Sequence, residues 1–202
     1  DGLAARKLGV AGDMGKQLDS LADVVTFGVL PGLIWKSLME YNGFCPTGSF
    51  CINQYTWMMI PLAAAYRLAK FNIDTRQTTG FIGIPTPMTG MALGSFAWMS
   101  YSMGHSTGVW IIEKPLIDLS SLFSNYYVWL YMPLLASYMM ISEIPMLSLK
   151  RVKNDPLGKY KLILLGMILP CLLFGSTGVI VYYFGYIVVS ILSNFATQSV
   201  DQ

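Results

Sequence analysis

Apolar stretches long enough to cross a lipid bilayer recur along this sequence, and they leave few ways for the chain to fold. A membrane-spanning helix needs about 20 consecutive apolar residues. Six stretches meet or approach that length: residues 17–39, 53–71, 84–103, 126–149, 160–174 and 178–195. The last two are divided only by the sequence FGSTG, and residues 1–8 are predicted to end a preceding helix. The sequence therefore predicts an all-α fold, a polytopic transmembrane helix bundle.

Composition excludes an ordinary soluble domain. Charged residues make up 12% of the 202 residues, hydrophobic residues make up 54%, and the mean hydropathy is +0.52. Soluble domains carry about 25% charged residues, so a soluble fold of this length would lack polar side chains to cover its surface. No internal repeat, low-complexity tract or linker divides the chain. We therefore expect one membrane-embedded domain over residues 1–202.

The basic residues give this domain an orientation. Of the 13 lysine and arginine residues, only Lys36 and Lys114 fall on one side of the predicted spans. All the others fall on the opposite side, which the positive-inside rule places in the cytoplasm. One wrong helix would scramble this alternation, so the agreement supports the assignment. We expect a multi-pass protein of the bacterial inner membrane whose first loop faces the cytoplasm.

Two carboxylates stand at the cytoplasmic head of the first apolar stretch. Asp19 and Asp23 are four residues apart, which places them on one helix face. A carboxylate in hydrocarbon normally faces a polar cavity and has a partner, and a divalent cation would relieve the repulsion between these two. Carboxylate oxygens suit Mg²⁺ or Mn²⁺, and Asp1 would add a third. The alternative is a water-facing charge favoured by the helix dipole, which is the preferred interpretation for Asp13.

Small and basic residues around these aspartates fit a phosphorylated ligand. Gly2, Ala5 and Gly15 leave the backbone bare, so a bulky ligand has room against the helices. Arg6 is suited to pair with a phosphate group. Small residues also let membrane helices approach one another closely, so the ordered combination carries the inference and no single glycine does.

That ordered combination resembles the motif of the CDP-alcohol phosphotransferase family, D-x-x-D-G-x-x-A-R, eight residues, then G-x-x-x-D-x-x-x-D. The matching positions are Asp1, Gly2, Ala5, Arg6, Gly15, Asp19 and Asp23. The first motif aspartate would stand three residues before Asp1, so the sequence begins inside the motif. Four further stretches resemble one branch, the type I CDP-diacylglycerol–serine O-phosphatidyltransferases: GKQLDSLADVVTFGVLPG (15–32), YRLAKFN (66–72), FIGIPTP (81–87) and IPMLSLK (144–150).

The resemblance implies transfer of a phosphatidyl group from CDP-diacylglycerol to L-serine, giving phosphatidylserine and CMP. It also implies two divalent ions, Mg²⁺ or Mn²⁺, held by the motif aspartates, here Asp1, Asp19 and Asp23. By the same resemblance, Asp23 would be the general base for the serine hydroxyl. Gly2, Ala5 and Arg6 would line the cytidine diphosphate site, with Gly15 near the phosphates. A homodimer surrounded by membrane lipids is expected, without a nucleic-acid partner.

The acceptor's carboxylate needs a cation, and the candidates lie near the end of the second apolar stretch. They are Arg67, Lys70 and Arg76, with Asn72 as a polar helper. Ordinary positive-inside anchoring explains Lys70 and Arg76 equally well, whereas Arg67 stands out because it lies inside the helix end. Glu143 has two interpretations: it pairs with a basic residue of the site, or it reaches the membrane interface.

Other functions stay open at this stage. Branches that accept glycerol 3-phosphate or inositol phosphate share the aspartates but resemble the later stretches less. A transporter would also use membrane carboxylates and Pro-kinked helices, although the hydropathy shows no inverted halves. A membrane scaffold would not need Asp19 and Asp23 together. Cys45 and Cys51 bracket an external loop and are equally consistent with a disulfide or with two thiols, and His105 is expected to be a loop residue.

Overall fold

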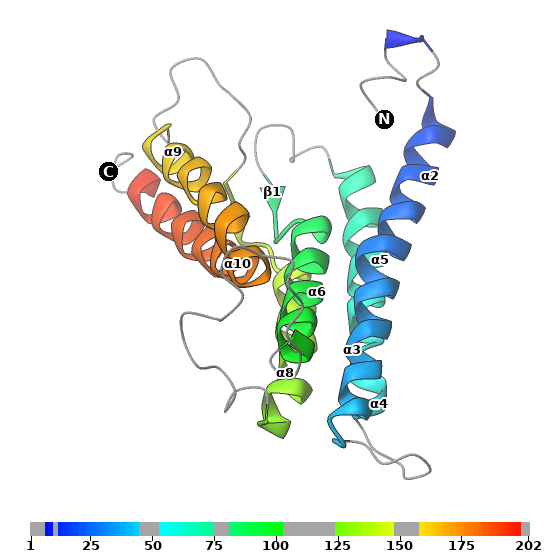
Figure 1. Ribbon diagram of the computed structural model, residues 1–202. Helices are drawn as coiled ribbons and strands as arrows, with labels where there is room; N and C mark the ends of the chain where they lie inside the picture. The colour runs from blue at the N-terminus through cyan, green and yellow to red at the C-terminus, as the bar shows by residue number, and fades with distance from the viewer. Residues whose placement is uncertain are drawn as a thin grey trace.

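The structure, a computed structural model, describes residues 7–9, 12–44, 53–74, 81–102, 124–147 and 158–198. These ranges are mainly helical (Figure 1), as predicted. The elements are α2 (Asp13–Val24), η1 (Val25–Val29), α3 (Leu30–Tyr41), α4 (Asn53–Thr56), α5 (Met59–Ile73), β1 (Phe81–Ile82), α6 (Thr86–Ser102), α8 (Tyr126–Ile141), β2 (Pro145–Met146), α9 (Gly158–Gly166) and α10 (Ile168–Gln198).

The first apolar stretch forms one continuous helix. The residues that join α2, η1 and α3 all keep right-handed helical dihedral angles, and η1 is a single π-helical segment between the two α-helices. Neighbouring helices approach it closely where glycines lie. A Cβ at Gly28 would lie 3.0 Å from Ala64 Cβ, and a Cβ at Gly90 would lie 2.7 Å from the Phe27 carbonyl oxygen. Small residues thus let α5 and α6 pack against the first helix.

The chain reverses direction inside α10, at Gly175. This glycine has φ 54° and ψ −123°, a backbone conformation that residues with a side chain rarely adopt. Two contacts hold the segments before and after this glycine together: Cys171 Sγ donates to the Gly178 carbonyl at 3.3 Å, and Met167, just before α10, lies against Gly185. Figure 1 accordingly shows α9 and the red end of α10 side by side. The predicted boundary between stretches 160–174 and 178–195 is confirmed.

Within the described ranges, two helices are long and apolar enough to cross a membrane. They are Asp13–Tyr41, with 29 residues, and Phe174–Phe195, with 22. The predicted stretch 126–149 was wrong over residues 142–147, because α8 ends at Ile141 and an extended segment follows. Ser142, the residue after the helix, already has an extended backbone with ψ 147°, and the residues that follow pair with a strand from earlier in the chain.

The extended segment pairs with another, which the all-α prediction did not include. Strands β1 and β2 are antiparallel, with Phe81 opposite Met146 and Ile82 opposite Pro145. Directly after β1, Gly83 donates its N–H to the Ile144 carbonyl at 2.9 Å. This pairing attaches the start of α6 to the end of α8.

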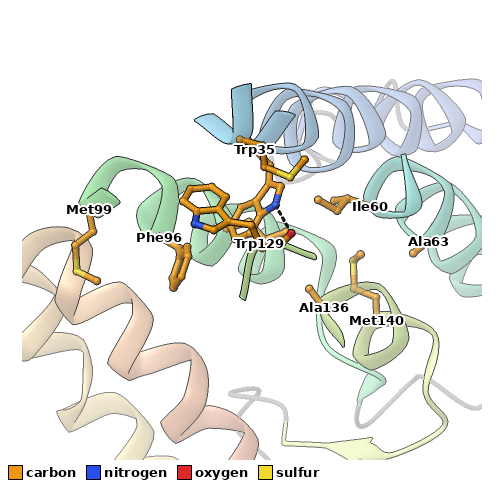
Figure 2. Close-up of a cluster of buried hydrophobic side chains, with 10 residues drawn as sticks. Trp35, Ile60, Ala63, Phe96, Met99, Trp129, Ala136 and Met140 are labelled. Atoms are coloured by element: carbon orange, nitrogen blue, oxygen red, sulfur yellow. Dashed lines mark hydrogen bonds between the residues drawn. The ribbon is translucent and has the colours of Figure 1, made fainter. Parts of the chain in front are cut away.

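Aromatic packing holds the middle of the bundle. Trp35 of α3, Phe96 of α6 and Trp129 of α8 meet in a buried cluster (Figure 2), with ring centroids 4.7 Å apart for the two tryptophans. Trp35 Nε1 also donates to the Trp129 carbonyl at 3.1 Å. Such aromatic pairs contribute about 0.5–1.5 kcal/mol beyond the area they bury. A second buried cluster, which includes Ile84, joins α6 to α9 and α10.

Candidate functional site

The two aspartates of the predicted metal site lie on α2, one helical turn apart. Asp19 is exposed and Asp23 is half-buried. Their carboxylates are close enough to repel each other, and Arg67 of α5 is close enough to attract Asp23. Within the described ranges, no three His, Cys, Asp or Glu side chains are grouped to hold a metal ion. Asp1, the predicted third ligand, lies outside those ranges.

Arg67 is the most constrained basic side chain of the site. It is 7% exposed, and its Nη1 donates to Thr86 Oγ1 at 3.2 Å; Thr86 is fully buried at the start of α6. Among the described residues, nothing accepts a hydrogen bond from the buried Nε of Arg67. A buried charge is costly unless it is paired and hydrogen-bonded. Arg67 therefore has both the charge and a spare donor for an anionic ligand group.

Lys70 follows Arg67 by three residues on α5 and forms an ion pair. Its Nζ lies 2.7 Å from Glu143 Oε1, in the turn between α8 and β2. The Lys70 side chain is 28% exposed and the Glu143 side chain is 68% exposed, so water reaches the pair. Of the two interpretations of Glu143, the structure selects pairing with a basic residue.

Asn72 connects α5 to α2. Its Nδ2 donates to Ser20 Oγ at 2.9 Å and to Gln17 Oε1 at 3.5 Å, while its carbonyl accepts from Lys16 Nζ at 3.1 Å. These contacts hold the end of α5 beside the helix that carries the aspartates. Binding of serine by Asn72 stays a prediction, and in this structure its amide donates to α2.

The stretches that carry the family resemblance therefore meet at one end of the bundle, which we call the motif end. Figure 1 shows the start of α2, the end of α5 and β1 at this end, uppermost in the view. Asn72 joins YRLAKFN to GKQLDS, Arg67 joins it to FIGIPTP through Thr86, and the β1–β2 pair joins FIGIPTP to IPM. Phe71 and Phe81 add a ring contact at 6.4 Å.

Sequence comparison with known proteins extends the family resemblance. The family model described as CDP-alcohol phosphatidyltransferase matches residues 1–113, more than half of the chain. The chain belongs to this family. The matched region contains α2 to α6 and therefore both aspartates, Arg67 and Thr86.

Several curated relatives of this chain carry informative names. A CDP-diacylglycerol–serine O-phosphatidyltransferase of Bacillus subtilis (strain 168) is 44% identical over 94 residues, which are 46% of this chain and 49% of the relative. An archaetidylserine synthase of Methanothermobacter thermautotrophicus is 31% identical over 126 residues, 60% of this chain and 50% of the relative. A CDP-diacylglycerol–serine O-phosphatidyltransferase of Mycobacterium leprae (strain TN) is 28% identical over 165 residues, which are 77% of this chain and 47% of the relative. The chain spans about half the length of the curated relatives it matches.

Beyond the region matched by the CDP-alcohol phosphatidyltransferase model, α10 supports the motif end. Tyr186 donates its hydroxyl to the Leu147 carbonyl at 2.9 Å, and Ser190 Oγ accepts from the Leu147 N–H at 3.3 Å. Asn194 Nδ2 donates to the Pro145 carbonyl at 2.7 Å. Sequence reasoning missed these residues and Thr86. The available signal was the spacing of Tyr186, Ser190 and Asn194, each four residues after the last, which places them on one helix face.

Of the remaining site predictions, one concerns a described residue, Gly15, and the others concern residues outside the described ranges. Gly15 lies on α2, and a Cβ built there would meet no described atom within 4 Å, so the helix surface is open at that point. The predictions outside the described residues are those for Asp1, Gly2, Ala5, Arg6, Arg76, Cys45, Cys51 and His105.

Proposed function

We propose that this protein transfers a phosphatidyl group from CDP-diacylglycerol to L-serine, giving phosphatidylserine and CMP. The observation that carries the proposal is the meeting of Asp23, Arg67 and Thr86 at the motif end, in a chain of the CDP-alcohol phosphatidyltransferase family. The names of two of the relatives add the acceptor, because both specify serine.

The aspartates fit a divalent metal ion. Asp19 and Asp23 present carboxylate oxygens on one accessible helix face, and they repel each other when no cation lies between them. We assign Asp1, Asp19 and Asp23 as ligands of two ions, Mg²⁺ or Mn²⁺. Such ions neutralise the charge of a pyrophosphate, and phosphoryl transfer depends mainly on that and on positioning. Gly2, Ala5, Arg6 and Gly15 are assigned to the cytidine diphosphate side.

Asp23 accepts the proton of the serine hydroxyl in this proposal. The serine oxygen then forms a bond to the phosphorus of the phosphatidyl group, and the bond from that phosphorus to the oxygen of CMP breaks. Arg67 holds the serine carboxylate, because it combines burial, a positive charge and a spare Nε donor. Lys70, three residues after Arg67 on α5, is the second cation for the serine carboxylate. Arg76 and Asn72 stay candidates for binding serine.

We infer a multi-pass arrangement in the membrane with the motif end facing the cytoplasm. Lys16, Arg67 and Lys70 lie at this end, as the positive-inside rule requires of a cytoplasmic face. The donor lipid keeps its acyl chains in the bilayer, so its head group has to be met at such a face. A homodimer is proposed from the family resemblance.

The proposal is tested with membranes that contain the full-length protein. They are incubated with CDP-diacylglycerol, Mn²⁺ and labelled L-serine, and with glycerol 3-phosphate or inositol phosphate in parallel reactions. We expect lipid-soluble label only from serine, with release of one CMP for each product. Product from another acceptor alone would replace serine in the proposal. Solute uptake that is independent of CDP-diacylglycerol would favour a transporter.

A further inference from the structure

We propose that Glu143, with Lys70, selects the acceptor by its charge: Glu143 binds the ammonium group of an amino-acid acceptor. This inference rests on the proposed function and adds a specificity residue to the same site. It starts from the ion pair between Lys70 Nζ and Glu143 Oε1, 2.7 Å apart, which joins two segments 73 residues apart in the chain. The pair is open to water, so a small polar molecule can reach both charges.

The pair lies beside the groups assigned to the reaction. Arg67 and Lys70 are three residues apart on α5 and therefore neighbours on its surface. Arg67 in turn lies close enough to Asp23 for their charges to interact. Serine carries its carboxylate and its ammonium on one carbon and its hydroxyl on the next, so neighbouring side chains have to receive all three groups. Asp23, the two cations and Glu143 form such a sequence of neighbours.

The backbone on both sides of Glu143 is firmly held. Before it, Ser142 Oγ donates to the Met139 carbonyl at 2.9 Å. After it, the Ile144 carbonyl accepts from Gly83 at 2.9 Å, and the Pro145 carbonyl accepts from Asn194 at 2.7 Å. A recognition group works best on a backbone that is fixed before the ligand arrives. Glu143 is therefore positioned in advance by β1 and by α10.

The charges of Lys70 and Glu143 explain how the site would discriminate between acceptors. A serine zwitterion can enter this site with both of its charges matched, its carboxylate between Arg67 and Lys70 and its ammonium toward Glu143. Glycerol 3-phosphate and inositol phosphate bring only negative charge, so Lys70 would be matched and Glu143 would repel the ligand. A site built to pair with a substrate group rejects an analogue that lacks the group, because its own polar atom is left unpaired.

The test is the Glu143→Gln variant in the full-length protein, which keeps the size of the side chain and removes its charge. The KM for L-serine is measured together with the inhibition constant of 3-hydroxypropionate, which is serine without its ammonium group. We expect the serine KM to rise at least about tenfold, as for a lost hydrogen bond to a charged group. The inhibition constant should stay unchanged or fall, and Glu143→Asp should recover part of the serine affinity.

Glu40→Gln is the matched control, because Glu40 also forms an ion pair, with Lys36 at 3.8 Å, on α3. It should leave both constants unchanged. If Glu143→Gln raises the KM and the inhibition constant by the same factor, Glu143 only holds Lys70, and the inference is overturned. An unchanged serine KM also overturns it. A wild-type protein that makes product only from another acceptor overturns the proposed function as well, so the two failures are distinguishable.

Discussion

Replacing Thr86 with valine tests how Arg67 is held. Valine keeps the shape of threonine but cannot accept the hydrogen bond that Arg67 Nη1 donates at 3.2 Å. Thr86 is fully buried and Arg67 is 7% exposed, so water cannot easily replace the lost partner. A hydrogen bond to a charged group contributes about 1.5–3 kcal/mol. If the whole loss falls on binding of the acceptor carboxylate, the serine KM rises about 10-fold to 150-fold.

The assay compares Thr86→Val with Thr89→Val in the same membranes. Thr89 is also fully buried on α6, but its hydroxyl donates to the Pro85 carbonyl at 3.4 Å. The Thr89 variant should lose some thermal stability and keep the serine KM of the wild type. If both variants have the same serine KM, Thr86 does not position Arg67 for the acceptor. A Thr86 variant that loses only stability would lead to the same conclusion.

Three further predictions follow from the site and the packing. Asp19→Asn and Asp23→Asn should each lower kcat by at least about 10²-fold, the lower end for a lost acid–base group; near-normal turnover in either would remove the metal-and-base assignment. Gly90→Ala should destabilise the protein by about 1–3 kcal/mol, because the new Cβ would lie 2.7 Å from the Phe27 carbonyl oxygen. Gly94→Ala is the control: its new Cβ would have no described atom within 4 Å, so this variant should have the melting temperature of the wild type. A single cysteine at residue 74 should be shielded in intact cells from an impermeant thiol reagent, and one at residue 108 should react; the reverse pattern would invert the topology.

The helices were predictable because their signals are local. An apolar stretch of sufficient length, or a glycine between two such stretches, is visible within a few residues of the sequence. The continuous helix over residues 13–41 and the reversal at Gly175 both follow from such signals. The end of α8 was not predicted, because it depends on pairing with β1, which lies about 60 residues earlier in the chain.

In the candidate site, too, the sequence predicted what depends on local spacing and did not predict the contacts between distant segments. The sequence alone placed Asp19 and Asp23 on one helix face, because a separation of four residues has that consequence in any α-helix. It also named Arg67, Lys70 and Arg76 as candidate cations and singled out Arg67 by its place inside the helix end, but it did not identify the partner of any of them. Their partners are distant in the sequence: Thr86 follows Arg67 by 19 residues, and Glu143 follows Lys70 by 73.

Only the tertiary structure decided which cation is buried with a spare donor and which is paired with a carboxylate. It also showed that α10, to which the sequence assigned no role, holds the backbone beside Glu143 through Asn194. The physical reason is that a hydrogen bond or an ion pair between distant segments depends on how whole helices pack. The spacing of residues within one helix does not contain that information.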